Sequence, residues 1–403
     1  MIEFEEASSL IFDAANPLGE MAKPIEDAVS YVLSRDIISP LSISPFRNSA
    51  MDGFAVRAEW LERCSPDNPI KLPIDTTVFA GDSGSAKISE NRPIRIMTGA
   101  PVPDKFDTVV KFEDTVYDDA HVVFAKPITQ GKNIRPAGED IHKDQLVLKR
   151  GHLLTPLDIG ILAGIGLKEV SVFKKPSVLV FSNGNELVSP GEKLKFGQIY
   201  DSNKYTVSSL IKPFVERIEI GPTVIDESEK LEQALSADFD VIITSGGVSA
   251  GEKDLVIGAA NKIGFEQVFH KARIKPGKPI FFAKKSQRLL FGLPGNPLST
   301  AVTCAVFVIP VLKKLIGRDD YEIRAENAVI NPEQIRPGGR LLIWPGKFRR
   351  TRSGITAEYS EKKSSAALSA LLNSDGLIFS DLSGNNVPAS TQVQVIFWNQ
   401  LLS

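Results

Sequence analysis

The sequence has few side chains that bind soft metals or form disulfides. It contains two cysteines and four histidines in 403 residues. Cys64 and Cys304 lie far apart in unrelated contexts, and the histidines are scattered. Disulfide frameworks and multi-cysteine zinc or iron–sulfur sites need several cysteines at characteristic spacings. The sequence therefore excludes both, together with a histidine-rich metal cluster.

The chain also lacks an excess of either charge. Lys and Arg number 47 against 49 Asp and Glu, which gives a formal net charge of -2. Binding to nucleic acid or to a membrane surface draws on a broad basic surface. We therefore expect no nucleic-acid or membrane partner, and any site for an anion must be local.

No targeting or membrane-spanning segment is apparent. The first ten residues, MIEFEEASSL, are acidic where a secretory signal is basic. The longest apolar run, 301–312, is shorter than a bilayer requires and contains Pro310. We expect a cytoplasmic protein.

The length and the changes of pattern along the chain predict a multidomain α/β plus β protein. Residues 24–33 resemble a helix that begins with a proline, and Thr155-Pro156-Leu157-Asp158 is typical of a second helix start. We expect a discontinuous mixed α/β domain at 1–41 and 141–175, a β-rich domain at 42–140, an α/β domain at 176–326 and a C-terminal β barrel or sandwich at 327–403.

Strands and helices alternate regularly within the α/β domain. The predicted strands are 177–182, 217–224, 240–244 and 288–293. The predicted helices are 203–216, 227–237, 253–262 and 298–316. Such alternation indicates a mainly parallel sheet.

Polar and glycine-bearing loops follow these strands. In an open parallel sheet, ligands bind at the carboxyl ends of the strands. The predicted acids there are Glu186, Asp226 and Asp254. The predicted ligand-binding loop residues are Ser245, Gly246, Gly247, Ser249, Gly251, Pro294, Asn296 and Pro297. Backbone N–H groups in glycine loops favour anions, although a tight strand-to-helix turn is the alternative interpretation.

A basic run lies just before the last predicted strand. Residues 267–288 contain seven Lys or Arg and no acid. A run of this kind often forms a solvated face. The prolines and glycine around Lys275 and Lys278 fix the spacing of the two lysines, which favours contact with phosphate or another oxyanion. We expect the run 267–288 to face the acids Glu186, Asp226 and Asp254.

The three acids suit a hard cation. Mg²⁺ takes a few carboxylates and keeps waters and substrate phosphate oxygens. We therefore predict Glu186, Asp226 and Asp254 as metal ligands, with helix capping as the alternative for each.

Nine segments, in order along the chain, closely resemble the molybdopterin molybdotransferases (the MoeA family), to which the E domain of gephyrin is related. They are SAMDGFAV (49–56), RIMTGAPVP (95–103), DTVVKFED (107–114), RPAGEDI (135–141), SNGNEL (182–187), GQIYDSN (197–203), SGGVSAGEKD (245–254), IKPGKP (274–279) and GLPGNPLS (292–299).

The resemblance implies an activity. Members of this family insert molybdate into adenylylated molybdopterin and cleave the adenylyl bond with the help of Mg²⁺. AMP is released and molybdenum cofactor is formed. The α/β domain would then have the molybdopterin-binding fold.

The resemblance also implies partners. Family members are elongated homodimers, with the cleft between the α/β domain of one subunit and the β-rich domain of the other. Molybdopterin adenylyltransferase and molybdoenzyme-maturation proteins would be further partners.

Family site residues carry over by motif. The catalytic acids fall on Asp52, Asp140, Glu186, Asp226 and Asp254. The family threonine falls on Thr98, its lysines on Lys271 and Lys275, its prolines on Pro294 and Pro297, and a serine on Ser365. Without the resemblance, the segments around Asp52, Thr98 and Asp140 would be ordinary turns.

The sequence departs from the family at two places. Asn185 stands where the family usually has Asp, and Trp344-Pro345-Gly346-Lys347 replaces an aromatic residue followed by Arg-Gly. A catalytically silent molybdopterin-binding or scaffold protein of the same fold is the alternative function. A generic dehydrogenase is disfavoured because no GxGxxG motif is present.

Overall fold

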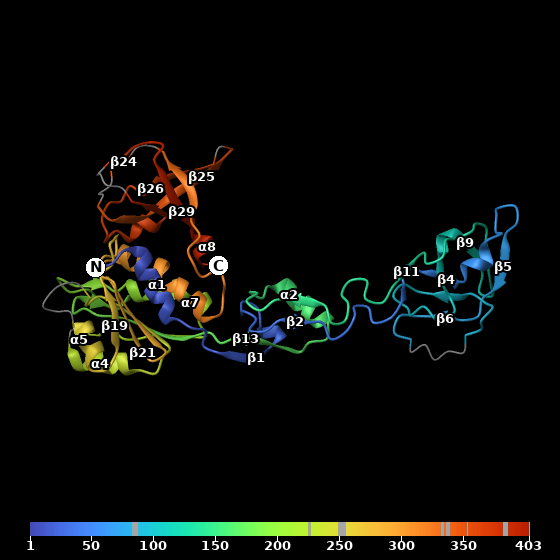
Figure 1. The fold of residues 1–403 in the computed structure, drawn as a ribbon, viewed down its shortest axis with the longest axis horizontal. Coiled ribbons are helices and arrows are strands. Elements are labelled where there is room, and N and C mark those ends of the chain that lie inside the picture. Colours follow the sequence, from blue (N-terminus) through green and yellow to red (C-terminus); the bar gives the residue numbers. More distant parts are fainter. Residues whose placement is uncertain are drawn as a thin grey trace.

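The computed structural model shows an elongated molecule with three regions along its length (Figure 1). A β-rich unit lies at one end, a small mixed unit in the middle, and an α/β unit with a β barrel at the other end. The structure describes residues 1–82, 88–224, 227–248, 255–331, 334–335, 339–352, 354–381 and 386–402.

The α/β unit is built on a six-stranded sheet. Its strands, in spatial order, are β17 (Arg217–Ile220), β14 (Ser177–Ser182), β18 (Val241–Ser245), β22 (Arg288–Leu293), β21 (Phe281–Lys285) and β19 (Glu266–His270). The first four are parallel, and β21 runs antiparallel to both β22 and β19. A mainly parallel sheet is thus confirmed, while the two strands at the antiparallel edge were not predicted.

Helices cover both faces of this sheet, which explains why the central strands are nearly all apolar. One face carries α4 (Ser228–Ser236) and α5 (Leu255–Lys262). The other carries α1 (Phe4–Ala14), α3 (Asn203–Ile211), α6 (Pro297–Thr303) and α7 (Ile309–Leu315), with a π-helical turn at Cys304–Val308. The N-terminal segment therefore contributes to the core of this unit.

The helical stretch Pro297–Leu315 is 19 residues long and apolar enough to cross a membrane by length and composition. However, 94% of its apolar window is buried inside the protein. The helical stretch is longer at both ends than the apolar run 301–312 from which its length was judged. Burial against the sheet, rather than shortness, therefore identifies it as a core helix.

The middle unit joins the two predicted chain segments. Strand β1 (Glu20–Pro24) pairs with β13 (Glu169–Phe173), and β2 (Ile37–Ile38) pairs with β12 (Leu146–Leu148). Helix α2 (Pro156–Gly164) begins as predicted, because Thr155 and Asp158 form a capping box. The unit has its own core, which includes Tyr31, Leu33 and Leu162.

The predicted helix at 24–33 is wrong. That segment contains the end of β1, a 3₁₀ turn at Ile25–Asp27 and extended chain. Pro24 ends β1, which pairs with β13 along five residues, and Val32 and Leu33 form bridges with Leu153 and Val172. Tertiary pairing has thus overridden a pattern that resembles a helix start.

The β-rich unit contains three small sheets, as its short strands predict. The first has β6 (Thr77–Val78), β7 (Ile94–Ile96), β4 (Gly53–Val56) and β8 (Thr108–Lys111). The second has β5 (Ile70–Pro73), β10 (His121–Phe124) and β9 (Thr115–Tyr117). The third has β3 (Asn48–Ser49) and β11 (Ile134–Arg135). Two apolar clusters on either side of β4 form the cores.

The C-terminal unit is a closed five-stranded barrel rather than a sandwich. Its strands, in order, are β25 (Leu341–Thr351), β26 (Gly354–Tyr359), β23 (Glu326–Ile330), β29 (Gln392–Phe397) and β27 (Gly376–Ser380). Pairing of β27 with β25 closes the ring. Strand β20 (Ile274–Lys275) of the α/β unit adds to β25. The short strands β24 (Gln334–Ile335) and β28 (Asn386–Val387) pair, and α8 (Trp398–Leu402) follows β29.

Gly376→Ala should destabilise the barrel by about 2 kcal/mol or more. A Cβ at this position would lie 1.9 Å from the backbone oxygen of Ile396, which has no room to move. Gly160→Ala in α2 is the matched control, because nothing lies within 4 Å of the added Cβ. It should stabilise its helix by about 0.5 to 1 kcal/mol. Calorimetric melting measures both, and equal midpoints for the two variants would contradict the packing described.

Candidate active site

The loops that follow the four parallel strands meet at one edge of the sheet. The Asn183 N–H donates to the Ser245 carbonyl at 2.8 Å, and the Gly184 N–H donates to the Val224 carbonyl at 3.2 Å. The Gly246 N–H donates to the Leu293 carbonyl at 3.0 Å. The shared edge predicted from the strand pattern is therefore present.

Glu186 is exposed at this edge, and its backbone is held by a small parallel pair. Strand β15 (Leu187–Val188) pairs with β16 (Ile199–Tyr200), and the Ile199 N–H donates to the Glu186 carbonyl at 2.9 Å. Among the residues that the structure describes, the Glu186 carboxylate has no hydrogen bond or ion pair. A fixed backbone with a free carboxylate suits a group that binds a cation.

Gly246 and Gly247 make a tight turn after β18. Their φ angles are +93° and +69°. An added Cβ at Gly246 would lie 2.3 Å from the backbone carbonyl oxygen of Asn183, and one at Gly247 would lie 2.6 Å from the side-chain Nδ2 of Asn183. The turn therefore requires glycine at both positions, and the Gly246 N–H is already used within the protein. Their role in binding an anion stays a prediction.

Ser245 is 3% exposed and holds the Pro294–Asn296 loop from inside. Its hydroxyl donates to the Pro294 carbonyl at 3.1 Å and accepts from Asn203 Nδ2 at 2.8 Å. These internal partners occupy the hydroxyl, so direct contact between Ser245 and an anion stays a prediction. Asn203, which was not among the predicted site residues, lies within the GQIYDSN segment.

The loop that follows β22 reaches the C-terminal part of the chain. Asn296 Nδ2 donates to Ser365 Oγ at 3.0 Å, and the Leu298 N–H donates to the Ser365 carbonyl at 3.1 Å. Pro294 is buried, and Pro297 is half-buried at the first position of α6. The structure thus brings together Asn296 and Ser365, two residues predicted separately.

Three predicted lysines lie in or just before the IKPGKP segment, whose strand β20 joins the α/β unit to the barrel. Lys271 and Lys275 are half-buried, and Lys278 is exposed. Burial lowers the pKa of Lys275, and the nearby positive charge of Arg340 lowers it further. Arg340 Nη1 donates to the Ile274 carbonyl at 3.3 Å. Arg340 is a cation that the sequence analysis missed, because only the pairing of β20 with β25 brings it to Lys275.

The basic run 267–288 does not form one surface. Lys285 and Arg288 are paired at the turn between β21 and β22, at the edge opposite Glu186. Arg288 donates to the carbonyl of Leu235 in the last turn of α4 and to that of Phe239, which lies between α4 and β18. The expectation that the whole run faces the acids is therefore wrong, because β21 reverses the chain between its two halves.

Asp52 and Thr98 meet in the β-rich unit. Asp52 Oδ1 accepts from the Thr98 N–H at 2.6 Å and from its hydroxyl at 2.8 Å. The Thr98 N–H, and then its hydroxyl, hold the pKa of Asp52 below its usual range. Asp140 is exposed nearer the middle unit, where its N–H donates to the Ile43 carbonyl at 3.4 Å.

The predicted site residues therefore form two groups. Asp52 and Thr98 lie in the unit at one end of the molecule, and Glu186 and the lysines belong to the unit at the other (Figure 1). None of the hydrogen bonds or ion pairs between described residues joins 47–135 to 176–402. One chain does not bring the two groups together.

Four predicted residues lie outside the described residues: Asp226, Ser249, Gly251 and Asp254. Two of the three predicted magnesium ligands are among them. Within the described part of the chain, no group of three or more His, Cys, Asp or Glu side chains is placed to hold a metal ion. Of the predicted set, only Glu186 is among the described residues, and its exposed carboxylate fits the oxygen chemistry of Mg²⁺.

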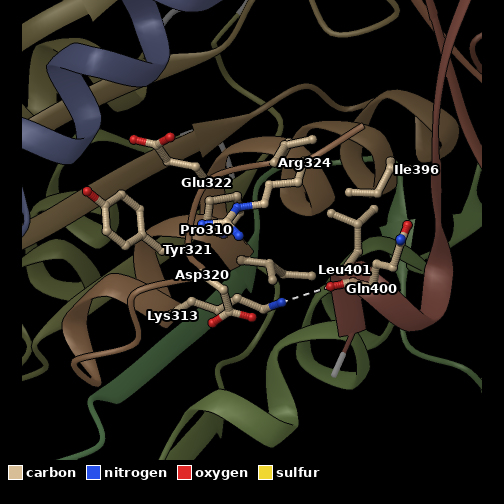
Figure 2. A pocket seen from close by; sticks show the side chains of 11 residues that line it. Pro310, Lys313, Asp320, Tyr321, Glu322, Arg324, Ile396, Gln400 and Leu401 are labelled. Carbon is tan, nitrogen blue, oxygen red and sulfur yellow. Dashed lines mark hydrogen bonds between the residues drawn. The ribbon is translucent and has the colours of Figure 1, made fainter. Parts of the chain in front are cut away.

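Three hollows lie on the surface of the part of the chain that the structure describes. A hollow of about 270 Å³ lies between α7, residues 320–324 and α8 (Figure 2). There the buried Lys313 donates to the Gln400 carbonyl at 2.9 Å. Two others, of about 230 and 420 Å³, lie beside Lys347 and beside β17. None of the three is lined by a predicted site residue, but the last of them includes Thr223 and Val224 of the loop that follows β17.

Two family models match most of the chain. Residues 2–166 match the MoeA N-terminal region (domain I and II), and residues 179–314 match a probable molybdopterin binding domain.

Known proteins resemble the chain over nearly its full length. It is 35% identical to the molybdopterin molybdenumtransferase of Haemophilus influenzae, over 94% of each chain. It is 33% identical to molybdopterin molybdenumtransferase 2 of Mycobacterium tuberculosis, over 98% of this chain and 99% of that one. A crystal structure of a molybdopterin biosynthesis MoeA protein from Pyrococcus horikosii has a TM-score of 0.85 and 28% identity, with 99% of both chains covered.

Thr98→Val should raise the pKa of Asp52 towards its usual range without restoring it fully. The substitution removes the hydroxyl donor but keeps the N–H, which is the larger cause of the depression. NMR titration of the Asp52 carboxyl carbon measures the change. In wild type, the hydrogen bonds to Asp52 stabilise the fold above its unfolded-state pKa, and this stability is lost as the pH falls through the folded-state pKa. An unchanged titration curve in the variant would contradict the hydroxyl contact.

Proposed function

The chain belongs to the molybdopterin molybdenumtransferase (MoeA) family, and we propose that it inserts molybdate into adenylylated molybdopterin to form molybdenum cofactor. The near full-length similarity to relatives that bear this name carries the proposal. In the proposed reaction, the adenylyl bond is cleaved and AMP is released. The local cations and free carboxylate at the sheet edge support it, because both substrates are anionic.

The reaction requires the cleavage of a phosphoanhydride. The oxygen of a water molecule adds to the adenylyl phosphorus and loses a proton to solvent while the anhydride P–O bond breaks. The molybdopterin phosphate leaves with the bonding electrons, and the adenylyl group leaves as AMP. Negative charge develops on the leaving phosphate, so fixed positive groups that face it accelerate the step.

The chain's residues divide this work by charge. Lys271 and Lys275 bind anionic groups. Burial and the nearby Arg340 lower the pKa of Lys275, so a bound anion would stabilise the charged form of this lysine. Glu186, together with Asp226 and Asp254 outside the described residues, would hold Mg²⁺, which when bound neutralises charge on the pyrophosphate. Asp52 and Thr98 form the facing wall, with the Asp52 carboxylate oriented by both Thr98 donors.

The facing wall comes from a second copy of the chain. Asp52 and Glu186 lie in units at opposite ends of one molecule (Figure 1). A homodimer that places the β-rich unit of one chain against the sheet edge of the other completes two equivalent clefts. The site is then shared between subunits.

Molybdate-dependent release of AMP tests the function directly. Purified protein is mixed with adenylylated molybdopterin and Mg²⁺, with or without molybdate, and AMP is quantified. The proposal expects release that depends on molybdate. Binding of the nucleotide without release would instead identify a silent binding or scaffold protein.

Glu186→Gln should reduce AMP release about 100-fold or more while melting near the wild-type temperature. The carboxylate is exposed and has no described partner, so its loss removes function rather than packing. Glu266→Gln is the matched control, because Glu266 is an exposed acid at the opposite edge of the same sheet, where it pairs with Lys284. Equal losses of activity in both variants would refute the role of Glu186.

Mixing two inactive variants tests the shared cleft. Asp52→Ala and Glu186→Ala chains are dissociated, combined and reassembled. Random assembly places one chain of each kind in about half of the dimers, and each such dimer has one intact cleft, so about a quarter of wild-type activity should return. Each variant reassembled alone is the control. No recovery in mixed dimers would place both residues in a cleft within one chain.

A further inference from the structure

Residues 199–204 contact the chain near the end of each of the four parallel strands. Next to β14, Ile199 and Asp201 donate their N–H groups to the carbonyls of Glu186 and Val188, both at 2.9 Å. At the segment that follows β17, Lys204 Nζ donates to Thr223 Oγ1 at 3.2 Å. Asn203 Nδ2 reaches Ser245 Oγ at the end of β18 and the Gly295 carbonyl after β22, both at 2.8 Å. One short segment thus links all four loops of the candidate site.

A buried ion pair forms the centre of these contacts. The side chains of Asp201 and Lys204 are 1% and 4% exposed, and Lys204 Nζ lies 3.4 Å from Asp201 Oδ2. Ser182 Oγ, on the last residue of β14, donates to Asp201 Oδ1 at 2.9 Å. Thr223 Oγ1 lies 3.3 Å from Asp201 Oδ2. The pair therefore holds the ends of β14 and β17 in one hydrogen-bonded network.

A buried pair of this kind is not the most stabilising way to fill the space. Removing two charges from water has a large cost, and apolar side chains of similar size often stabilise a fold as well or better. Hydrogen bonds to a buried pair are directional, so the network fixes the relative positions of the groups that it joins. The main contribution of Asp201 and Lys204 is therefore to fix the relative positions of these groups, and not to stabilise the fold.

Asn203 extends the same network to the other side of the edge. It is 7% exposed, and its amide donates to both Ser245 Oγ and the Gly295 carbonyl. Thr300 Oγ1 donates to the Asn296 carbonyl at 3.1 Å from within α6. The loop that carries Asn296 is therefore fixed relative to the same segment that fixes Glu186.

We propose that Asp201, Asn203 and Lys204 are positioning residues that set the placement of the Glu186 loop relative to the Pro294–Asn296 loop. They act through the loops and make no contact with substrate. The proposal rests on the proposed function for its consequence in catalysis, but the placement of the loops is a property of the protein alone.

The test compares the double variant Asp201→Asn/Lys204→Met with the single variant Asn203→Ala. The double variant removes both charges and preserves size, so no unpaired charge remains buried. Asp240→Asn is the matched control. Asp240 accepts from the Ser177 N–H at 2.8 Å and from its hydroxyl at 2.7 Å, at the opposite edge of the same sheet. Melting temperature, amide hydrogen exchange and steady-state kinetics are measured for each protein.

The double variant should melt near the wild-type temperature yet exchange amide hydrogens of residues 183–188 at least about tenfold faster. Its kcat should fall about tenfold or more while KM changes little, because misplaced groups lose orientation rather than binding. Asn203→Ala should accelerate exchange at 294–296, and Asp240→Asn should leave both loops and kcat unchanged.

If the double variant has the amide hydrogen exchange rates and the kcat of wild type, the proposal is overturned. The ion pair of Asp201 and Lys204 would then only fill space in the core. If the double variant does not fold, Asn203→Ala decides the question by the same two readouts at 294–296. Failure of the wild-type protein to release AMP would refute the proposed function instead. Hydrogen exchange would still test the positioning network in that case.

Discussion

The ion pair between Asp201 and Lys204 is the interaction on which the candidate site depends. Parallel strands end at a common edge of the sheet, but the loops that follow these strands need buried side chains to hold them in place relative to one another. Here a carboxylate and an ammonium, both nearly fully buried, bind the last residue of β14 and the segment that follows β17. Asn203, between them in sequence, binds the ends of the other two parallel strands. The exposed Glu186 carboxylate is thus carried by a fixed backbone.

A second constraint is the separation of two groups of predicted site residues within one chain. The β-rich unit is separated from the sheet edge by the middle unit (Figure 1). The Asp52 carboxylate accepts hydrogen bonds from the Thr98 N–H and hydroxyl, and both residues lie within the β-rich unit. We therefore propose that a second copy of the chain completes the site.

Local patterns predicted much of this arrangement, and long-range contacts account for what they missed. The four parallel strands follow from β-branched runs, and the start of α2 follows from Thr155 and Asp158. The segment 24–33 was mistaken for helix because the partners of its extended residues lie far along the chain. Buried charges such as Asp201 and Lys204 resemble solvated ones in sequence. Arg340 reaches Lys275 only because β20 adds to the barrel.

The central claim is that a sheet edge of one chain and the β-rich unit of another enclose the substrate. A crystal structure with adenylylated molybdopterin bound tests it most directly. The account predicts that the pyrophosphate lies between Glu186 and Lys275 of one subunit and Asp52 and Thr98 of its partner, with residues 199–204 buried beneath. Nucleotide bound entirely within one chain, or remote from the edge formed by β14 and β18, would contradict it.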